Sequence, residues 1–166
     1  MKKMSAVVTY APGDNRYEEY PVPALSDGEI LLKVRGCGIC AGDLKAYHGG
    51  IRVWGISEAD RYIEPPCIPG HEFYGEVVET KGDVGDFQAG DIICAEQVVP
   101  CNECYFCKNG TYWMCTRSAV FGFKEYTNGG FAEYVKLPKT SLKHKLPKTF
   151  TKEQSVLVEP IACGMH

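Results

Sequence analysis

Residues 29–36 read E-I-L-L-K-V-R-G, and their alternation predicts a β-strand. Every second side chain from Ile30 to Val34 is aliphatic, whereas the charged side chains of Lys33 and Arg35 occupy intervening positions. Successive side chains of a strand point to opposite faces. One face of this segment can therefore enter a hydrophobic core while the other is partly exposed to water.

Similar short runs rich in Val, Ile, Phe and Tyr recur along the chain, separated by 18 glycines and 10 prolines. This pattern is typical of short strands joined by turns, so we expect a mostly β fold. The other predicted strands are Ala6–Tyr10, Phe73–Thr80, Ile92–Glu96 and Phe131–Leu137.

Helix signals are fewer. Residues 41–48 predict a short helix that ends at Gly49 and Gly50. Thr151 and Gln154 have the spacing of a capping box, which predicts a second helix starting there.

Length and charge limit the function. The 166 residues suffice for one domain with its own core, and 45% hydrophobic with 23% charged residues is the balance of a globular protein. The net charge of -3 offers no basic face, so we expect a small-molecule partner and no nucleic acid. The apolar runs are too short for an export signal or a membrane span, so we expect no membrane partner and a cytoplasmic location.

Four cysteines lie in one short segment, as Cys101, Cys104, Cys107 and Cys115, with the spacing C-x2-C-x2-C-x7-C. Four thiolates in one loop can close on a tetrahedral ion, which favours a structural zinc without an open position. An iron-sulfur cluster is the alternative, because closely spaced cysteines also hold such clusters.

A second set of potential ligands is spread over three segments: Cys40, then His71 and Glu72, then Glu159. A thiolate, an imidazole and carboxylates with one position left open make up a catalytic zinc site. Each of these residues alone would also fit an ordinary surface or core position. Their combination with the four-cysteine loop favours a role as metal ligands.

These motifs follow one another in the order C-G-I-C-x-x-D, P-G-H-E-F-x-G, C-x2-C-x2-C-x7-C, G-G-F-A-E-Y and V-E-P. The order resembles the zinc-containing medium-chain dehydrogenase/reductase family over essentially the whole chain. Within that family, the tracts around Asp43, Cys67 and Cys101 look most like erythritol or threitol dehydrogenases, with sorbitol and threonine dehydrogenases next.

The resemblance implies a GroES-like barrel with two zincs per chain, one structural and one catalytic. Cys40 and His71 would hold the catalytic zinc, with Glu72 as a third or a switching ligand. Glu159 would bind this zinc directly or through its water. Asp43 would accept the second ring N–H of His71 and so orient it.

One position departs from the family pattern. Where most relatives have a serine or threonine hydroxyl that passes the substrate proton towards solvent, this sequence has Gly42. Lys45, Tyr47 and His48 are the nearby candidates for relaying that proton or for holding a substrate hydroxyl. Cys37 is interpreted as a packing residue.

The resemblance also implies a reaction and a division into domains. Residues 1–155 would form the catalytic domain, and residues 156–166 would start the crossover towards a nucleotide-binding domain. No G-x-G-x-x-G follows a predicted strand, so NAD or NADP would bind on a Rossmann domain beyond His166. Zinc would act as a Lewis acid while hydride passes from a polyol or alcohol to the nicotinamide.

Further expectations concern the oligomeric state, the activity of the chain alone and its C-terminal residues. The full-length enzyme is predicted to be a homo-oligomer, and the chain alone to be inactive. Residues after Leu157 are predicted to be disordered, or packed against another copy, without the cofactor domain.

Alternatives to a polyol dehydrogenase are a threonine-type dehydrogenase and a non-catalytic, zinc-stabilised GroES-like module. Two zincs per chain would favour an enzyme, and one would favour the module. A zinc-free quinone reductase relative conflicts with both cysteine sets.

Overall fold

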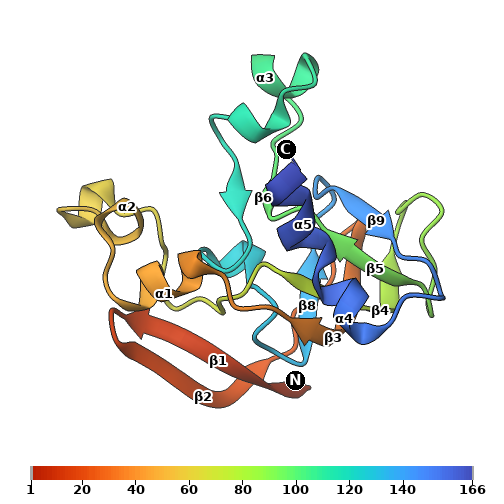
Figure 1. Cartoon of the computed structure of the whole chain (residues 1–166), viewed down its shortest axis with the longest axis horizontal. Helices are drawn as coiled ribbons and strands as arrows, with labels where there is room; N and C mark the ends of the chain where they lie inside the picture. Colours follow the sequence, from red (N-terminus) through yellow and green to blue (C-terminus); the bar gives the residue numbers. More distant parts are fainter. Residues whose placement is uncertain (1, 166) are drawn as a thin grey trace.

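The structure, a computed structural model, describes residues 2–165 and is mostly β, as predicted (Figure 1). A five-stranded antiparallel sheet in the order β8-β3-β4-β5-β9 forms its centre. Its strands are β3 (Glu29–Cys37), β4 (Phe73–Lys81), β5 (Ile92–Ala95), β8 (Tyr134–Leu137) and β9 (Lys143–Lys145).

The alternation at residues 29–36 produces strand β3, as expected. Ile30 and Leu32 are fully buried, and Lys33 and Arg35 are exposed. Leu31 is buried as well, because the register with β4 shifts between Leu31 and Leu32 and a helix packs against both strands. The main core lies on this sheet and contains Ile30, Leu32, Phe73, Val77, Ile93, Ala95, Val99, Phe121, Val135 and Leu137.

A two-stranded hairpin, β1 (Lys3–Ala11) and β2 (Asp14–Pro21), covers a second core next to the sheet. The first strand was predicted, but the second was missed. Residues of β2 are mostly exposed, so the segment D-N-R-Y-E-E-Y-P carries no buried apolar face that its sequence could reveal. The predicted strand at Phe131–Leu137 is also shorter in the structure and begins at Tyr134.

Both predicted helices are present. Helix α1 (Ala41–Tyr47) is followed by the single-turn α2 (Ile51–Trp54). Helix α4 (Lys152–Val156) has the expected capping box: the Thr151 N–H donates to Gln154 Oε1 at 2.9 Å and the Gln154 N–H donates to Thr151 Oγ1 at 3.2 Å.

The prediction of disorder after Leu157 is wrong for the described residues. Residues 158–165 form helix α5 (Val158–Met165), and His166 lies outside the described part. The helix is anchored because Val156 and Val158 pack against a small buried cluster that contains Tyr74 and Leu146.

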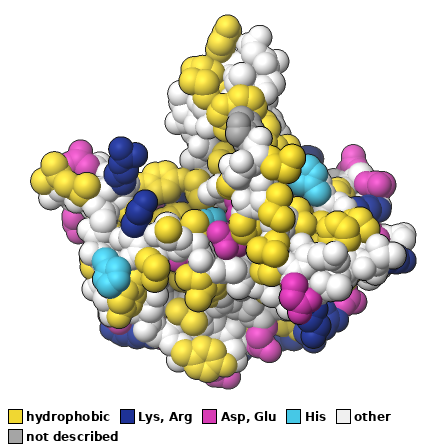
Figure 2. Space-filling view, viewed as in Figure 1, with side chains coloured by type: hydrophobic (Ala, Val, Ile, Leu, Met, Phe, Trp, Pro, Cys, Tyr) yellow, Lys and Arg dark blue, Asp and Glu magenta, His cyan; other side chains and the backbone are white. Residues whose placement is uncertain are grey.

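The segment between β6 (Val98–Val99) and β7 (Ala119–Val120) projects from the body as a lobe (Figure 1). It carries α3 (Tyr105–Lys108) and the 3-10 turn η2 (Tyr112–Met114). Two further 3-10 turns are η1 (Glu58–Asp60) and η3 (Glu125–Thr127). Figure 2 shows hydrophobic side chains exposed on this lobe and over α5. Among residues 2–165, no helix has the length and apolar character needed to cross a bilayer.

Candidate metal centres

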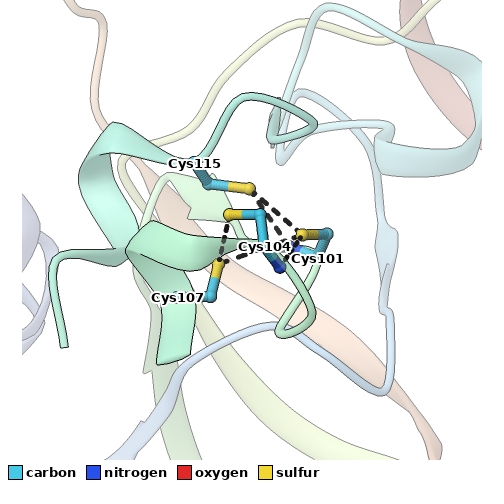
Figure 3. A group of neighbouring side chains, drawn as sticks. All are labelled: Cys101, Cys104, Cys107 and Cys115. Atoms are coloured by element: carbon cyan, nitrogen blue, oxygen red, sulfur yellow. Dashed lines mark hydrogen bonds between the residues drawn. The ribbon is translucent and has the colours of Figure 1, made fainter. Parts of the chain in front are cut away.

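The projecting lobe brings its four cysteines together (Figure 3). The Cys101–Cys107, Cys104–Cys107 and Cys115–Cys101 sulfur pairs are separated by 4.0, 3.5 and 3.5 Å. A tetrahedral ion with bonds of about 2.3 Å to sulfur requires separations of about 3.8 Å. The sulfurs are too far apart for disulfides, and the spacing therefore matches a closed four-thiolate site.

Backbone N–H groups stabilise negative charge in this cluster. The N–H groups of Glu103 and Cys104 donate to Cys101 Sγ at 3.5 and 3.4 Å. The Glu103 hydrogen bond is the main reason that the pKa of Cys101 falls to about 6. Desolvation raises the pKa of Cys107 to about 12, so that without a metal this cysteine would hold its proton.

The second centre is assembled by the pairing of β3 with β4. The register places Cys37, the last residue of β3, opposite Phe73, the first residue of β4. Residues that directly follow β3 therefore lie beside residues that directly precede β4. As a result, Cys40, His71 and Glu72 each offer a ligand atom within 4.8 Å of the other two.

His71 is the most buried member of this group, with 4% of its surface exposed. Its ring stacks on Phe123, with 6.2 Å between the ring centroids and 26° between the planes. His71 Nδ1 is buried without a hydrogen-bond partner and lies 3.7 Å from Asp43 Oδ1, outside hydrogen-bonding distance. Asp43 Oδ2 accepts the Cys40 backbone N–H at 2.8 Å, so Asp43 faces both residues.

Glu159, in α5, is buried but does not belong to this three-residue group. Its Oε1 accepts a hydrogen bond from Cys163 Sγ at 3.2 Å. Burial is the largest reason that the pKa of Glu159 is raised, and the charges of His71 and Glu72 also act on it. Glu159 therefore lies close enough to this centre for electrostatic coupling, with its carboxylate held by another residue.

The remaining predicted residues lie around α1. Lys45, Tyr47 and His48 are all exposed, and the structure gives none of them a contact with His71 or Cys40, so the proton relay stays a prediction. Gly42 is next to the centre: a Cβ there would lie 3.6 Å from both Cys40 Sγ and His71 Cε1. Cys37 packs against the main core, and burial raises its pKa to about 12, which suits a packing role.

Sequence reasoning missed Cys163 and Gln97. Gln97 Nε2 donates to Cys163 Sγ at 3.2 Å. Together with Glu159 they border a cavity of about 510 Å³ between β5, η2 and α5. The only available signal was the spacing of Glu159 and Cys163, which are four residues apart and share one face of a helix.

Comparisons with known proteins agree with this fold. The family described as the alcohol dehydrogenase GroES-like domain matches residues 26–148. An erythritol/L-threitol dehydrogenase of Mycolicibacterium smegmatis is 42% identical over 99% of this chain and 46% of its own length. An L-threonine 3-dehydrogenase of Pyrococcus horikoshii is 37% identical over 96% of this chain and 44% of its own.

A solved structure from Sinorhizobium meliloti 1021, described as a zinc-binding dehydrogenase bound to NADP, superposes with a TM-score of 0.85. It is 30% identical and is matched over 100% of this chain and 45% of its own. The chain thus belongs to the family of GroES-like alcohol dehydrogenase domains, as the motif order predicted. It spans slightly less than half the length of these relatives.

Proposed function

We propose that this chain is the catalytic domain of a zinc-dependent polyol dehydrogenase, which oxidises a secondary alcohol of a polyol to a ketone with NAD or NADP. The observation that carries this proposal is the convergence of Cys40, His71 and Glu72. These three donors differ in chemistry and come from two separate segments. A module stabilised only by the four-cysteine cluster would not need them.

The residues of both centres fit zinc. Four thiolates at tetrahedral spacing suit a structural ion, whereas a thiolate, an imidazole and a carboxylate leave a fourth position open for substrate. Zinc bound there would supply Lewis acidity, which lowers the pKa of a substrate hydroxyl. The orphaned Nδ1 of buried His71 faces Asp43, so a small ring rotation would complete the hydrogen bond that orients this ligand.

The surrounding residues set the position of the donors. Asp43 fixes the backbone at Cys40, and the stacked ring of Phe123 limits rotation of the imidazole. Buried Phe123, Ile63 and Ala46 form an apolar cluster on this side of the centre. We propose that this cluster excludes water from the carbon that loses hydride, while residues 156–166 lead towards the domain that binds the nicotinamide.

The test combines metal analysis of the purified chain with activity of the full-length enzyme, because the chain alone is expected to be inactive. We expect two zincs per chain and NAD- or NADP-dependent oxidation of four-carbon polyols such as erythritol or threitol. The Cys40→Ala variant should lose one zinc and all activity, whereas Cys37→Ala, which alters a neighbouring cysteine outside the group, should keep both. A single zinc in the wild-type protein would contradict the proposal and favour the non-catalytic module.

A second candidate is a threonine-type dehydrogenase, which the 37% identical Pyrococcus horikoshii relative favours. The larger identity of the erythritol/L-threitol relative, 42%, makes a polyol the first choice. Assays with L-threonine and with polyols at equal concentration decide between them.

A further inference from the structure

Among the predicted ligands of the second centre, Glu159 has a carboxylate that is already bound by another side chain. Its Oε1 accepts the Cys163 thiol hydrogen at 3.2 Å, and Cys163 Sγ in turn accepts Gln97 Nε2–H at 3.2 Å. The three side chains therefore form a directed chain of hydrogen bonds that ends on the carboxylate. A thiol has a single hydrogen to donate, so this arrangement assigns it to Glu159.

The backbone fixes this contact. Glu159 and Cys163 are four residues apart in α5, so their side chains lie on the same face of the helix. Gln97 lies directly before β6, and its backbone carbonyl accepts the Phe121 N–H at 3.0 Å. Phe121 directly follows β7 and is fully buried, so this hydrogen bond fixes the backbone of Gln97. The contact therefore joins the helix to the base of the four-cysteine lobe.

The hydrogen bond between Cys163 and Glu159 matters because Glu159 is a potential ligand of the nearby metal centre. Cys40, His71 and Glu72 lie within ligand distance of one another, and Glu159 does not. Glu159 is nevertheless buried and interacts electrostatically with His71 and Glu72. A buried carboxylate that feels the charges of a metal centre is a potential ligand unless another group holds it.

We propose that Cys163 is a positioning residue that, supported by Gln97, holds the Glu159 carboxylate away from the metal bound by Cys40, His71 and Glu72. This inference rests on the proposed function, because it presupposes that these three residues bind a metal. Its consequence is that the fourth coordination position stays open for substrate and is not closed by Glu159. No change of charge or oxidation state is involved.

The experiment measures the affinity of the purified protein for Co²⁺, which absorbs visible light when bound to a thiolate. Four proteins are compared: wild type, Cys163→Ala, Glu159→Gln and the double variant. The four-cysteine cluster is the same in all of them, and Cys40→Ala identifies the absorption band of the second centre. We expect Cys163→Ala to bind Co²⁺ roughly three- to tenfold more tightly, because the released carboxylate becomes an additional ligand.

The double-mutant comparison separates positioning from a general structural effect. If Cys163 acts through Glu159, its replacement has no effect on affinity in the Glu159→Gln background. The conservative variant Cys163→Ser keeps a hydrogen-bond donor and should stay within about twofold of wild type. Gln97→Ala removes only the hydrogen bond from Gln97 to the Cys163 thiol and should shift the Co²⁺ affinity in the same direction as Cys163→Ala. It provides a second test if Cys163→Ala does not fold.

Two results would overturn the inference. The first is an unchanged or weakened Co²⁺ affinity in Cys163→Ala, and the second is an equal effect of Cys163→Ala in the wild-type and the Glu159→Gln backgrounds. Absence of a Cys40-dependent band in the wild type would instead overturn the proposed function, and this inference with it. The failures of the two proposals are therefore distinguishable.

Discussion

Gly38 lies directly against the carboxylate of Glu72: a Cβ at Gly38 would stand 2.2 Å from Glu72 Oε2. The Gly38 backbone N–H also donates to the Glu72 carbonyl at 2.9 Å. The Glu72 carboxylate occupies the space that a side chain at position 38 would need. The glycine in C-G-I-C thus leaves room for the carboxylate that lies beside Cys40 and His71.

This relationship gives a matched pair of substitutions. Gly38→Ala should displace the Glu72 carboxylate and lower metal affinity at this centre by about tenfold or more. Gly42→Ala is the control, because its Cβ would lie at an ordinary 3.6 Å from Cys40 Sγ and His71 Cε1. We expect the control to keep the metal and to stabilise α1 by roughly 0.5 kcal/mol, measured by denaturant unfolding. Equal metal affinities in the two variants would contradict this account of Gly38.

The two centres differed in how far the sequence could predict them. The four cysteines lie within 15 residues, so their spacing alone brings them to one lobe, and the structure agrees. Cys40 and His71 are thirty-one positions apart, and only the β3–β4 register explains their meeting. The resemblance to a family predicted that they meet, whereas the local pattern could not.

The errors have physical reasons too. Strand β2 was missed because its side chains are mostly exposed, so the sequence shows no hydrophobic periodicity. The hydrogen bond expected between Asp43 and His71 stays a prediction: Asp43 Oδ1 lies 3.7 Å from His71 Nδ1, while Asp43 Oδ2 accepts the Cys40 N–H. The role of Cys163 could not be predicted because its partner Gln97 is 66 residues away.

Asp43 carries two roles that substitutions can separate. Asp43→Asn keeps an oxygen for the Cys40 N–H but loses the charge that faces His71, so metal affinity should fall by about 10- to 100-fold with little loss of stability. Asp43→Ala loses the helix cap as well and should cost about 1 kcal/mol of unfolding free energy in addition. Metal titration and denaturant unfolding measure the two effects. Equal stability of the two variants would refute the capping role.

The four-cysteine lobe should unfold locally when its cluster is broken. Cys104→Ser removes one of four thiolates, and the lobe is joined to the body mainly through the short β6–β7 pair. We expect amide hydrogen exchange to rise over residues 98–120 while β3 and β4 stay protected. Thr116→Ala, an exposed change in the same lobe, is the control and should leave exchange unaltered. Loss of protection in β3 and β4 would mean that the cluster stabilises the whole domain.

The two metals should leave in a fixed order when a chelator is added. The lobe offers four thiolates that close around an ion, whereas the second centre has three donors, because Cys163 holds the Glu159 carboxylate. With fewer protein ligands and an open position, the second metal should be bound more weakly and be more accessible to the chelator. Titration with a chelator, followed by metal analysis and by hydrogen exchange of the lobe, should therefore show one zinc lost before residues 98–120 lose protection. Simultaneous loss of both ions, or loss of the lobe zinc first, would show that the three-donor centre holds its metal at least as tightly.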